Sequence, residues 1–196
     1  MKNQKGFSYI DVMIAIVILM VGVLAMLSAL TANLIRSLES EKLVVAKQLA
    51  LSTVESVISA KEISRTDVNE SWDAMRNTDA PPITEPDGTI VNGIFLTGFN
   101  PVRDEEGWDG VAGTIDDACA SSGPCIVPGR PDNTSLVKNG YQRQVIVTDI
   151  DDPDRPAASG YKIKRRRIEV HIRYFAFQFA RDEVASTILT DYANSN

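Results

Sequence analysis

The chain has 196 residues, of which 44% are hydrophobic and 23% are charged, and its formal net charge is −6 at pH 7. One histidine and two cysteines leave few side chains for a metal centre or for nucleophilic catalysis. The acidic balance argues against a general polyanion-binding protein.

The first predicted element is an apolar helix that begins at Phe7. The 24 residues from Phe7 to Leu30 include no lysine, arginine or proline and a single acid, Asp11. A helix of this length is about 36 Å long, enough to cross a hydrocarbon core of about 30 Å. A carboxylate near one end of such a segment costs on the order of 2–3 kcal/mol unless a positive group neutralises it. We therefore expect a membrane-spanning helix in which Asp11 has a specific partner.

The residues before this helix indicate its orientation and help to classify it. Lys2 and Lys5 precede the apolar run, so the positive-inside rule predicts a cytoplasmic N-terminus and export of everything after Leu30. A secretory signal peptide has a shorter apolar stretch that ends in a small-residue cleavage site. A plain membrane anchor would explain the length and the two lysines, but it would not explain Asp11.

A third interpretation is a type IV prepilin signal. Residues 1–6, Met-Lys-Asn-Gln-Lys-Gly, resemble the short basic leader that prepilin peptidase removes after glycine. The following Phe-Ser-Tyr-Ile-Asp-Val-Met-Ile-Ala resembles the F-[TS]-L-[IL]-E-V-[ML]-[IV]-A start of the type IV pilin-like family. Residues 16–25, and the lack of a mid-helix proline, are most similar to the PilV group of minor pilins.

This resemblance implies roles for three residues. Gly6 would be the last leader residue, and Phe7 would be the new N-terminus, N-methylated by the same enzyme. Asp11 occupies the position of the family's acidic residue, which is usually glutamate. Two staggered helices could pair the Phe7 ammonium with Asp11 inside an apolar filament core, where an unpaired charge is very costly. Aspartate is one methylene shorter than glutamate and Tyr9 replaces the usual leucine, so the pairing geometry here can differ.

The helix is predicted to continue through residues 31–62, which contain no proline or glycine. Apolar residues recur there at three- and four-residue steps. The apolar arc is wider than the stripe of about 100° that a surface helix needs. We expect this half to pack both on its own domain and on neighbouring subunits. Packing on one sheet in a monomer is the alternative.

Residues 63–196 are predicted to form an exported head, and its first part, residues 67–140, is predicted to be a long loop region. Turn signals fill it, and one strand candidate, Thr89 to Phe99, interrupts it. Cys119 and Cys125, in a Ser/Gly/Pro-rich context, are expected to form one small disulfide in an oxidising periplasm. A metal site would need two more ligands, and a redox pair would need C-x-x-C spacing.

One acidic turn is a candidate for calcium because several carboxylates lie within it. These are Asp149, Asp151, Asp152 and Asp154. Oxygen ligands suit calcium, but the spacing matches no EF-hand. We favour an ordinary solvated turn and expect no cofactor.

The C-terminal part, residues 141–192, is predicted to be an antiparallel β-sheet. We expect strands over 141–150, 161–179 and 184–192, with residues 181–183 as a tight connection. Four apolar residues should share the side that faces the helix: Ile168, Val170, Ile172 and Tyr174. A positive patch comprises Lys162, Lys164, Arg165, Arg166 and Arg167. Nucleic-acid binding is one interpretation of this patch, and contact with acidic groups of the protein itself is the one we prefer.

Taken together, these features favour a pilin-like α+β protein without enzymatic activity, since no catalytic motif is present. The expected function is that of a minor type IV pilin, which primes, caps or modifies pili for adhesion, twitching motility or DNA uptake. A type II secretion pseudopilin and a monomeric single-pass membrane-anchored binding domain are the alternatives. Expected partners are prepilin peptidase, other pilin subunits, the pilus assembly platform and inner-membrane lipid. The head would be periplasmic first and exposed on the pilus afterwards.

Overall fold

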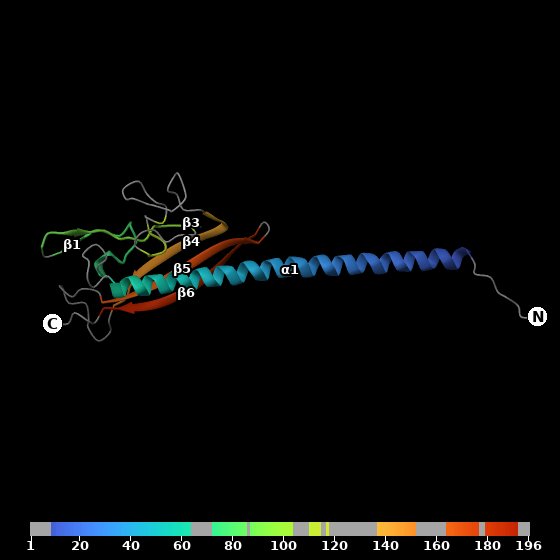
Figure 1. The fold of residues 1–196 in the computed structure, drawn as a ribbon, viewed down its shortest axis with the longest axis horizontal. Coiled ribbons are helices and arrows are strands. Elements are labelled where there is room, and N and C mark those ends of the chain that lie inside the picture. The colour runs from blue at the N-terminus through green and yellow to red at the C-terminus, as the bar shows by residue number, and fades with distance from the viewer. Residues whose placement is uncertain are drawn as a thin grey trace, which may run out of the picture. The chain divides into compact units, whose positions relative to one another are not determined.

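A computed structural model describes residues 9–63, 72–85, 87–103, 110–114, 117, 137–151, 164–176 and 179–191. The chain divides into two compact units, residues 1–42 and 43–196. One helix, α1 (Tyr9–Ile63), contributes residues to both (Figure 1). The absence of proline and glycine from residues 31–62 is consistent with its unbroken course.

The second unit contains two antiparallel sheets (Figure 1). The larger has the order β3-β4-β5-β6, and the smaller pairs β1 with β2. Their bounds are β1 (Ile83–Thr84), β2 (Ile90–Val91), β3 (Asn100–Arg103), β4 (Val137–Asp149), β5 (Arg165–Ala176) and β6 (Phe179–Thr190). A single 3₁₀ turn, η2 (Trp72–Ala74), precedes the strands. The coarse prediction of a long apolar N-terminal helix with antiparallel sheets, an α+β protein, is confirmed.

The core of the second unit forms where α1 packs on one face of the larger sheet. Along β5, buried and more exposed residues alternate with the period of two that a half-buried strand shows. The predicted inward set, Ile168, Val170, Ile172 and Tyr174, is confirmed, because all four are buried in one cluster with α1. The helix contributes mostly small or β-branched residues to this cluster: Ala46, Ala50, Val54, Val57 and Ala60.

Several strand predictions are wrong in their boundaries. The strand predicted over 161–179 corresponds to β5 alone only as far as Ala176, because Phe179 already belongs to β6. Residues 181–183 do not connect strands but lie within β6, whose register with β5 begins at the pair Ala176 and Phe179. The strand candidate Thr89 to Phe99 is reduced to β2. Beyond it, the backbone at Gly93 runs so close to Asn77 that an added Cβ would lie 2.1 Å from the Asn77 carbonyl oxygen. This close approach, with a single bridge between Asn77 and Phe95, replaces a regular ladder.

Candidate functional site

The predicted assembly site lies on the first half of α1. Asp11 is in the first turn, and it is the single charged residue between Tyr9 and Ile35. The positive end of the helix macrodipole favours a carboxylate there. Gly6 and Phe7, the predicted processing residues, lie outside the described residues.

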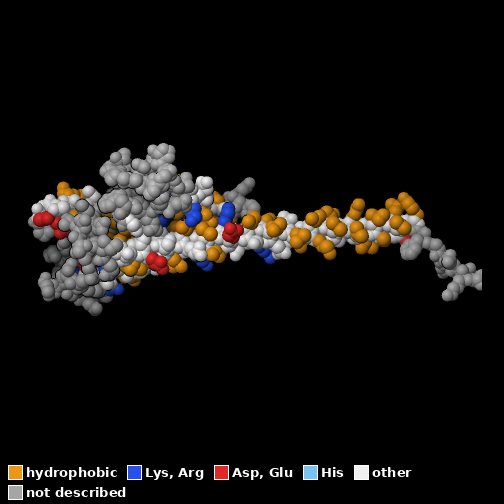
Figure 2. Space-filling view, in the orientation of Figure 1, with side chains coloured by type: hydrophobic (Ala, Val, Ile, Leu, Met, Phe, Trp, Pro, Cys, Tyr) orange, Lys and Arg blue, Asp and Glu red, His pale blue; other side chains and the backbone are white. Residues whose placement is uncertain are grey.

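The surface of α1 beyond Asp11 carries no charge as far as Ile35 and is mostly apolar. Every residue from Tyr9 to Leu38 is exposed, and Figure 2 shows hydrophobic side chains along this part of α1. Burying one such side chain is worth about 1.5–3 kcal/mol, so water is a poor environment for the segment as a whole. By length and composition, the helix could cross a membrane.

Polar side chains within this apolar stretch bond to the helix's own backbone. The Ser28 hydroxyl donates to the Leu24 carbonyl at 3.0 Å, and the Thr31 hydroxyl donates to the Leu27 carbonyl at 2.9 Å. Such bonds to the preceding turn satisfy hydroxyls where no water is available. These two residues therefore do not prevent burial of the segment in lipid or in protein.

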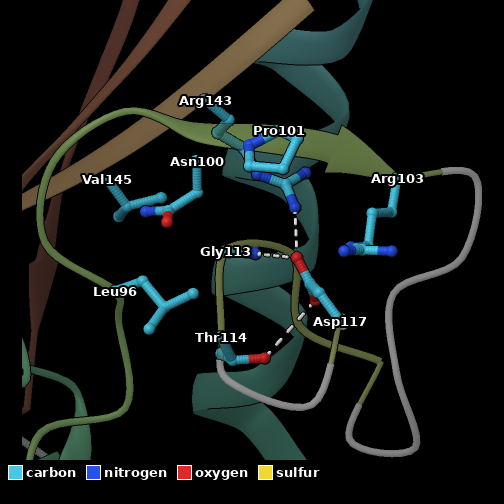
Figure 3. Close-up of a pocket in the computed structure, with 9 residues that line it drawn as sticks. All are labelled: Leu96, Asn100, Pro101, Arg103, Gly113, Thr114, Asp117, Arg143 and Val145. Atoms are coloured by element: carbon cyan, nitrogen blue, oxygen red, sulfur yellow. Dashed lines mark hydrogen bonds and ion pairs between the residues drawn. The ribbon is translucent and has the colours of Figure 1, made fainter. Parts of the chain in front are cut away.

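A different polar cluster lies inside the second unit, where Asp117 and Gly113 contact α1 and β4. Arg143 of β4 forms a buried ion pair with Asp117 and donates from Nη1 to the Thr53 hydroxyl of α1 at 3.3 Å. The Gly113 amide donates to the same Asp117 carboxylate at 2.8 Å (Figure 3). The Thr53 hydroxyl in turn donates to the Leu49 carbonyl at 2.8 Å. The Arg143 side chain thus connects the helix and the sheet with Asp117.

A cavity of about 170 Å³ lies beside this cluster (Figure 3). Its lining includes the apolar side chains of Leu96 and Val145 as well as Asn100, Arg103 and the Arg143–Asp117 pair. Thr114 also lines it, but its hydroxyl donates to the Val111 carbonyl at 2.9 Å, and the nearby Asp117 carboxylate is paired with Arg143. Because the guanidinium of Arg143 is already bonded to Asp117 and Thr53, we assign this cluster a structural role.

A second buried arginine corrects the predicted positive patch. Arg166 is 2% exposed, because residues 166 and 168 lie on the same, inward face of β5. Its guanidinium lies 4.6 Å from the centre of the Trp72 ring, donates to the Trp72 carbonyl, and donates from Nε to the Asp149 carboxylate at 2.8 Å. Nearby, burial and then repulsion from Arg166 lower the pKa of Arg76. Lys162 lies outside the described residues, and because Arg166 is withdrawn, the described members of the patch do not form one exposed surface.

One of the four candidate calcium ligands is already engaged within the protein. Asp149 is bonded to Arg166, and Asp151 is exposed. Asp152 and Asp154 lie outside the described residues, as do Cys119 and Cys125. Within the part of the chain that the structure describes, no group of three or more histidine, cysteine or acidic side chains could hold a metal ion.

The candidate site is thus an apolar helix surface with one acid at its start. Comparison with known proteins adds no relative. No protein-family model, curated protein or solved structure matches the chain. Any assignment of function therefore depends on the residues themselves.

Sequence reasoning missed both buried arginine clusters. For Arg166 a signal existed, because it is two residues before Ile168 on a strand of period two. For Arg143 the alternation placed it on the face of Val145, yet nothing in the sequence pointed to Asp117, 26 residues earlier. Asn77 was also missed. Asn77 Nδ2 donates to the Val145 carbonyl at 2.7 Å, and Asn77 Oδ1 accepts from the Val147 amide at 2.9 Å. The Asn77 side chain therefore bonds to the edge of β4 where β3 no longer pairs with it.

Proposed function

We propose that this chain is a pilin-like structural subunit, a minor type IV pilin that primes, caps or modifies a filament. The observation that carries the proposal is that Asp11 is the single charged residue on a fully exposed helix surface from Tyr9 to Ile35. A membrane anchor has no need of a carboxylate there, and the charge is costly in hydrocarbon. A filament in which the N-terminal ammonium of each subunit pairs with the acid of the next subunit requires a carboxylate at this position.

The proposed cycle has two stages that use the same surface. Before assembly, residues 7–30 lie in the inner membrane with the N-terminus in the cytoplasm. Prepilin peptidase cuts after Gly6, which creates an ammonium at Phe7. The same enzyme then methylates this nitrogen. The assembly platform then moves the helix from lipid into a filament of other pilin subunits. There the Phe7 ammonium of one chain neutralises Asp11 of another.

The second half of α1 supports a multi-subunit state. Its buried face packs on the sheet, yet three large apolar residues remain exposed at seven-residue intervals: Val44 at 50%, Leu51 at 57% and Ile58 at 40%. Residues seven apart lie on one side of a helix. This second stripe suits contact with a helix of another subunit, as the width of the apolar arc predicts.

The role proposed is structural and involves no substrate chemistry. Nucleic acid is not a proposed partner, because the chain is acidic overall and Arg166 is withdrawn from the surface. The test is processing: Gly6→Ala should leave the protein membrane-bound at its uncut mass and absent from sheared filaments. Wild-type protein should appear there six residues shorter, with a methylated Phe7. Isolation of the wild-type chain with its first six residues attached, and always as a monomer, would overturn the proposal.

A further inference from the structure

β6 is the last strand of the larger sheet, and a hydrogen bond at its end shows how its backbone is oriented. The Asp191 amide donates to the Lys164 carbonyl at 2.8 Å, which continues the register in which Arg165 pairs with Thr190. Hydrogen-bonded pairs alternate along an antiparallel ladder. The odd-numbered residues of β6 therefore direct their N–H and C=O groups to β5, and the even-numbered residues direct theirs to the other side.

That other side of β6 is an open strand edge. Among the described strands none pairs with it, because β6 ends the order β3-β4-β5-β6. The even-numbered residues from 180 to 188 are all exposed, including the large apolar side chains of Val184 at 53% and Ile188 at 49%. From Val184 to Thr190 the strand carries no charge and no proline. A long, uncharged edge of this kind is a template for pairing with another strand.

The opposite edge of the same sheet is protected against such pairing. β3 has only four residues, and its register with β4 shifts after Pro101. The bonds from Asn77 to Val145 and Val147 show that the odd-numbered residues of β4 direct their backbone groups to the β3 side. Asn100 pairs with one of these odd-numbered residues and is therefore bonded to β4. The nitrogen of Pro101 then points away from β4, and it offers no donor to a further strand.

We propose that β6 pairs antiparallel with β6 of a second copy of this chain, about a twofold axis at Ser186. Because the edge of β3 is protected, β6 is the edge of the larger sheet that a second copy can use. In this register Val184 lies opposite Ile188 of the other copy. Arg181 lies opposite Asp191 of the other copy, and the symmetry makes each contact twice. Directly opposed apolar residues and opposite charges stabilise an antiparallel pair.

The neighbouring registers lose these contacts. A register shift of two residues is the smallest that keeps each side chain on its own face of the sheet. Moving the axis one residue toward the N-terminus gives such a shift and puts Ile188 opposite Asp182. Moving it one residue toward the C-terminus puts Glu183 opposite Asp191, so that two acids face each other. The strand is thus complementary to itself in the register centred on Ser186, which favours a second copy as the occupant of this edge.

The symmetry of this pair has a consequence for where it forms. A twofold axis of this kind reverses the strands of the second copy, together with the part of α1 that packs on them. Subunits of one filament share one direction, so two heads paired through β6 belong to different filaments. The inference therefore goes beyond the proposed function, since it describes a lateral contact between filaments that run in opposite directions. It does not require cleavage after Gly6, so either proposal can fail without the other.

The test uses the full chain, purified in detergent micelles, with one added cysteine and mild oxidation. Ser186→Cys places two thiols directly opposite each other, where a Cα separation of about 5.5 Å allows a disulfide. Ala180→Cys is the matched control, because Ala180 is also an exposed, even-numbered residue of β6. Its counterpart in the other copy would lie about 40 Å away along the strand. The wild-type chain gives the background from Cys119 and Cys125.

We expect Ser186→Cys to give at least tenfold more disulfide-linked dimer than Ala180→Cys on a non-reducing gel. When chains with Val184→Cys and chains with Ile188→Cys are mixed, they should link to each other more than to themselves. Equal yields from Ser186→Cys and Ala180→Cys would overturn the proposal. A Ser186→Cys chain that stays monomeric when pure, but links to a different protein in cells, would replace the second copy by a strand of another partner.

An exchange of charges tests the register separately. In the Ser186→Cys chain, Arg181→Asp should reduce the dimer at least threefold, because it opposes two acids. Asp191→Arg should do the same by opposing two arginines. The two substitutions together restore opposite charges and should return the dimer to its original yield, while equal melting temperatures show that the head stays folded. A yield that none of these changes alters would contradict pairing in this register.

Discussion

Arg143 and Asp117 form an ion pair that is almost completely buried, with side chains 6% and 8% exposed. The pair lies between α1 and the sheet, and the Thr53 hydroxyl and the Gly113 amide complete it. Ion pairs of this kind are costly to desolvate, but they become far more costly when one partner is removed. The pair therefore holds Asp117 to the helix and the sheet through one side chain.

Truncation of the acid should destabilise the head strongly. Asp117→Ala leaves the Arg143 guanidinium buried without its carboxylate, so we expect a loss of about 3–5 kcal/mol in the free energy of unfolding. Urea denaturation of the full chain in detergent micelles, followed by near-ultraviolet circular dichroism, measures this loss. The double variant Arg143→Met/Asp117→Leu should lose less than Asp117→Ala alone. Equal stability of Asp117→Ala and wild type would show that the pair is not formed.

The contact between Arg166 and Asp149 predicts that calcium does not stabilise the protein through Asp149. We expect Asp149→Asn to lower the melting temperature, because an uncharged amide interacts less strongly than a carboxylate with the buried Arg166 guanidinium. The decrease should be the same in millimolar calcium and in chelator, as measured by differential scanning fluorimetry. A melting temperature of the wild type that rises with calcium, and no longer does so in Asp149→Asn, would restore the acidic turn as a metal site.

The tight backbone approach at Gly93 predicts intolerance of any side chain. Gly93→Ala would place a methyl group 2.1 Å from the Asn77 carbonyl oxygen, so the segment must shift. Overpacking of this kind costs about 1–3 kcal/mol, and we expect a loss of that size in urea denaturation. Gly22→Ala is the control, because no atom lies within 4 Å of the position that its Cβ would take. An unchanged midpoint for Gly93→Ala would mean that Gly93 does not approach Asn77.

The turn between β1 and β2 predicts a small dependence on pH. The Thr89 amide donates to the Asp87 carboxylate at 2.9 Å, and this bond lowers the pKa of Asp87. A lowered folded pKa means that the contribution is present at neutral pH and disappears as pH falls through that value. A carboxyl-carbon NMR titration should give Asp87 a pKa below that of an aspartate in a model peptide. Thr89→Pro, which removes the amide donor, should return it toward the ordinary range.

The parts of the fold that could be predicted from sequence are those specified by periodicity. The apolar run from Phe7, the absence of helix breakers to residue 62, and the alternation from Ile168 to Tyr174 each report a local preference. Pairings over long sequence distances could not be predicted in this way. Arg143 finds Asp117 across 26 residues, and Asn77 finds β4 across about 70. Such contacts depend on how the loops fold back.

The ends of the strands could not be predicted from local sequence patterns either. Residues Arg181, Asp182 and Glu183 look like a turn because they are consecutive charges, yet they continue β6. Asp182 there gains a cross-strand ion pair with Arg173, which offsets the weak strand preference of aspartate. The candidate assembly site, in contrast, is local, because a single acid within an apolar helix can be recognised from the sequence alone.

The central claim is that Asp11 exists to pair with the processed N-terminus of a neighbouring subunit. Asp11→Ala and Asp11→Glu can be compared with wild type by quantifying the protein in sheared filament and in inner-membrane fractions. The account predicts that Asp11→Ala is cut after Gly6 and inserts normally but falls at least tenfold in sheared filaments, whereas Asp11→Glu retains incorporation. Incorporation of Asp11→Ala at the wild-type level would contradict it.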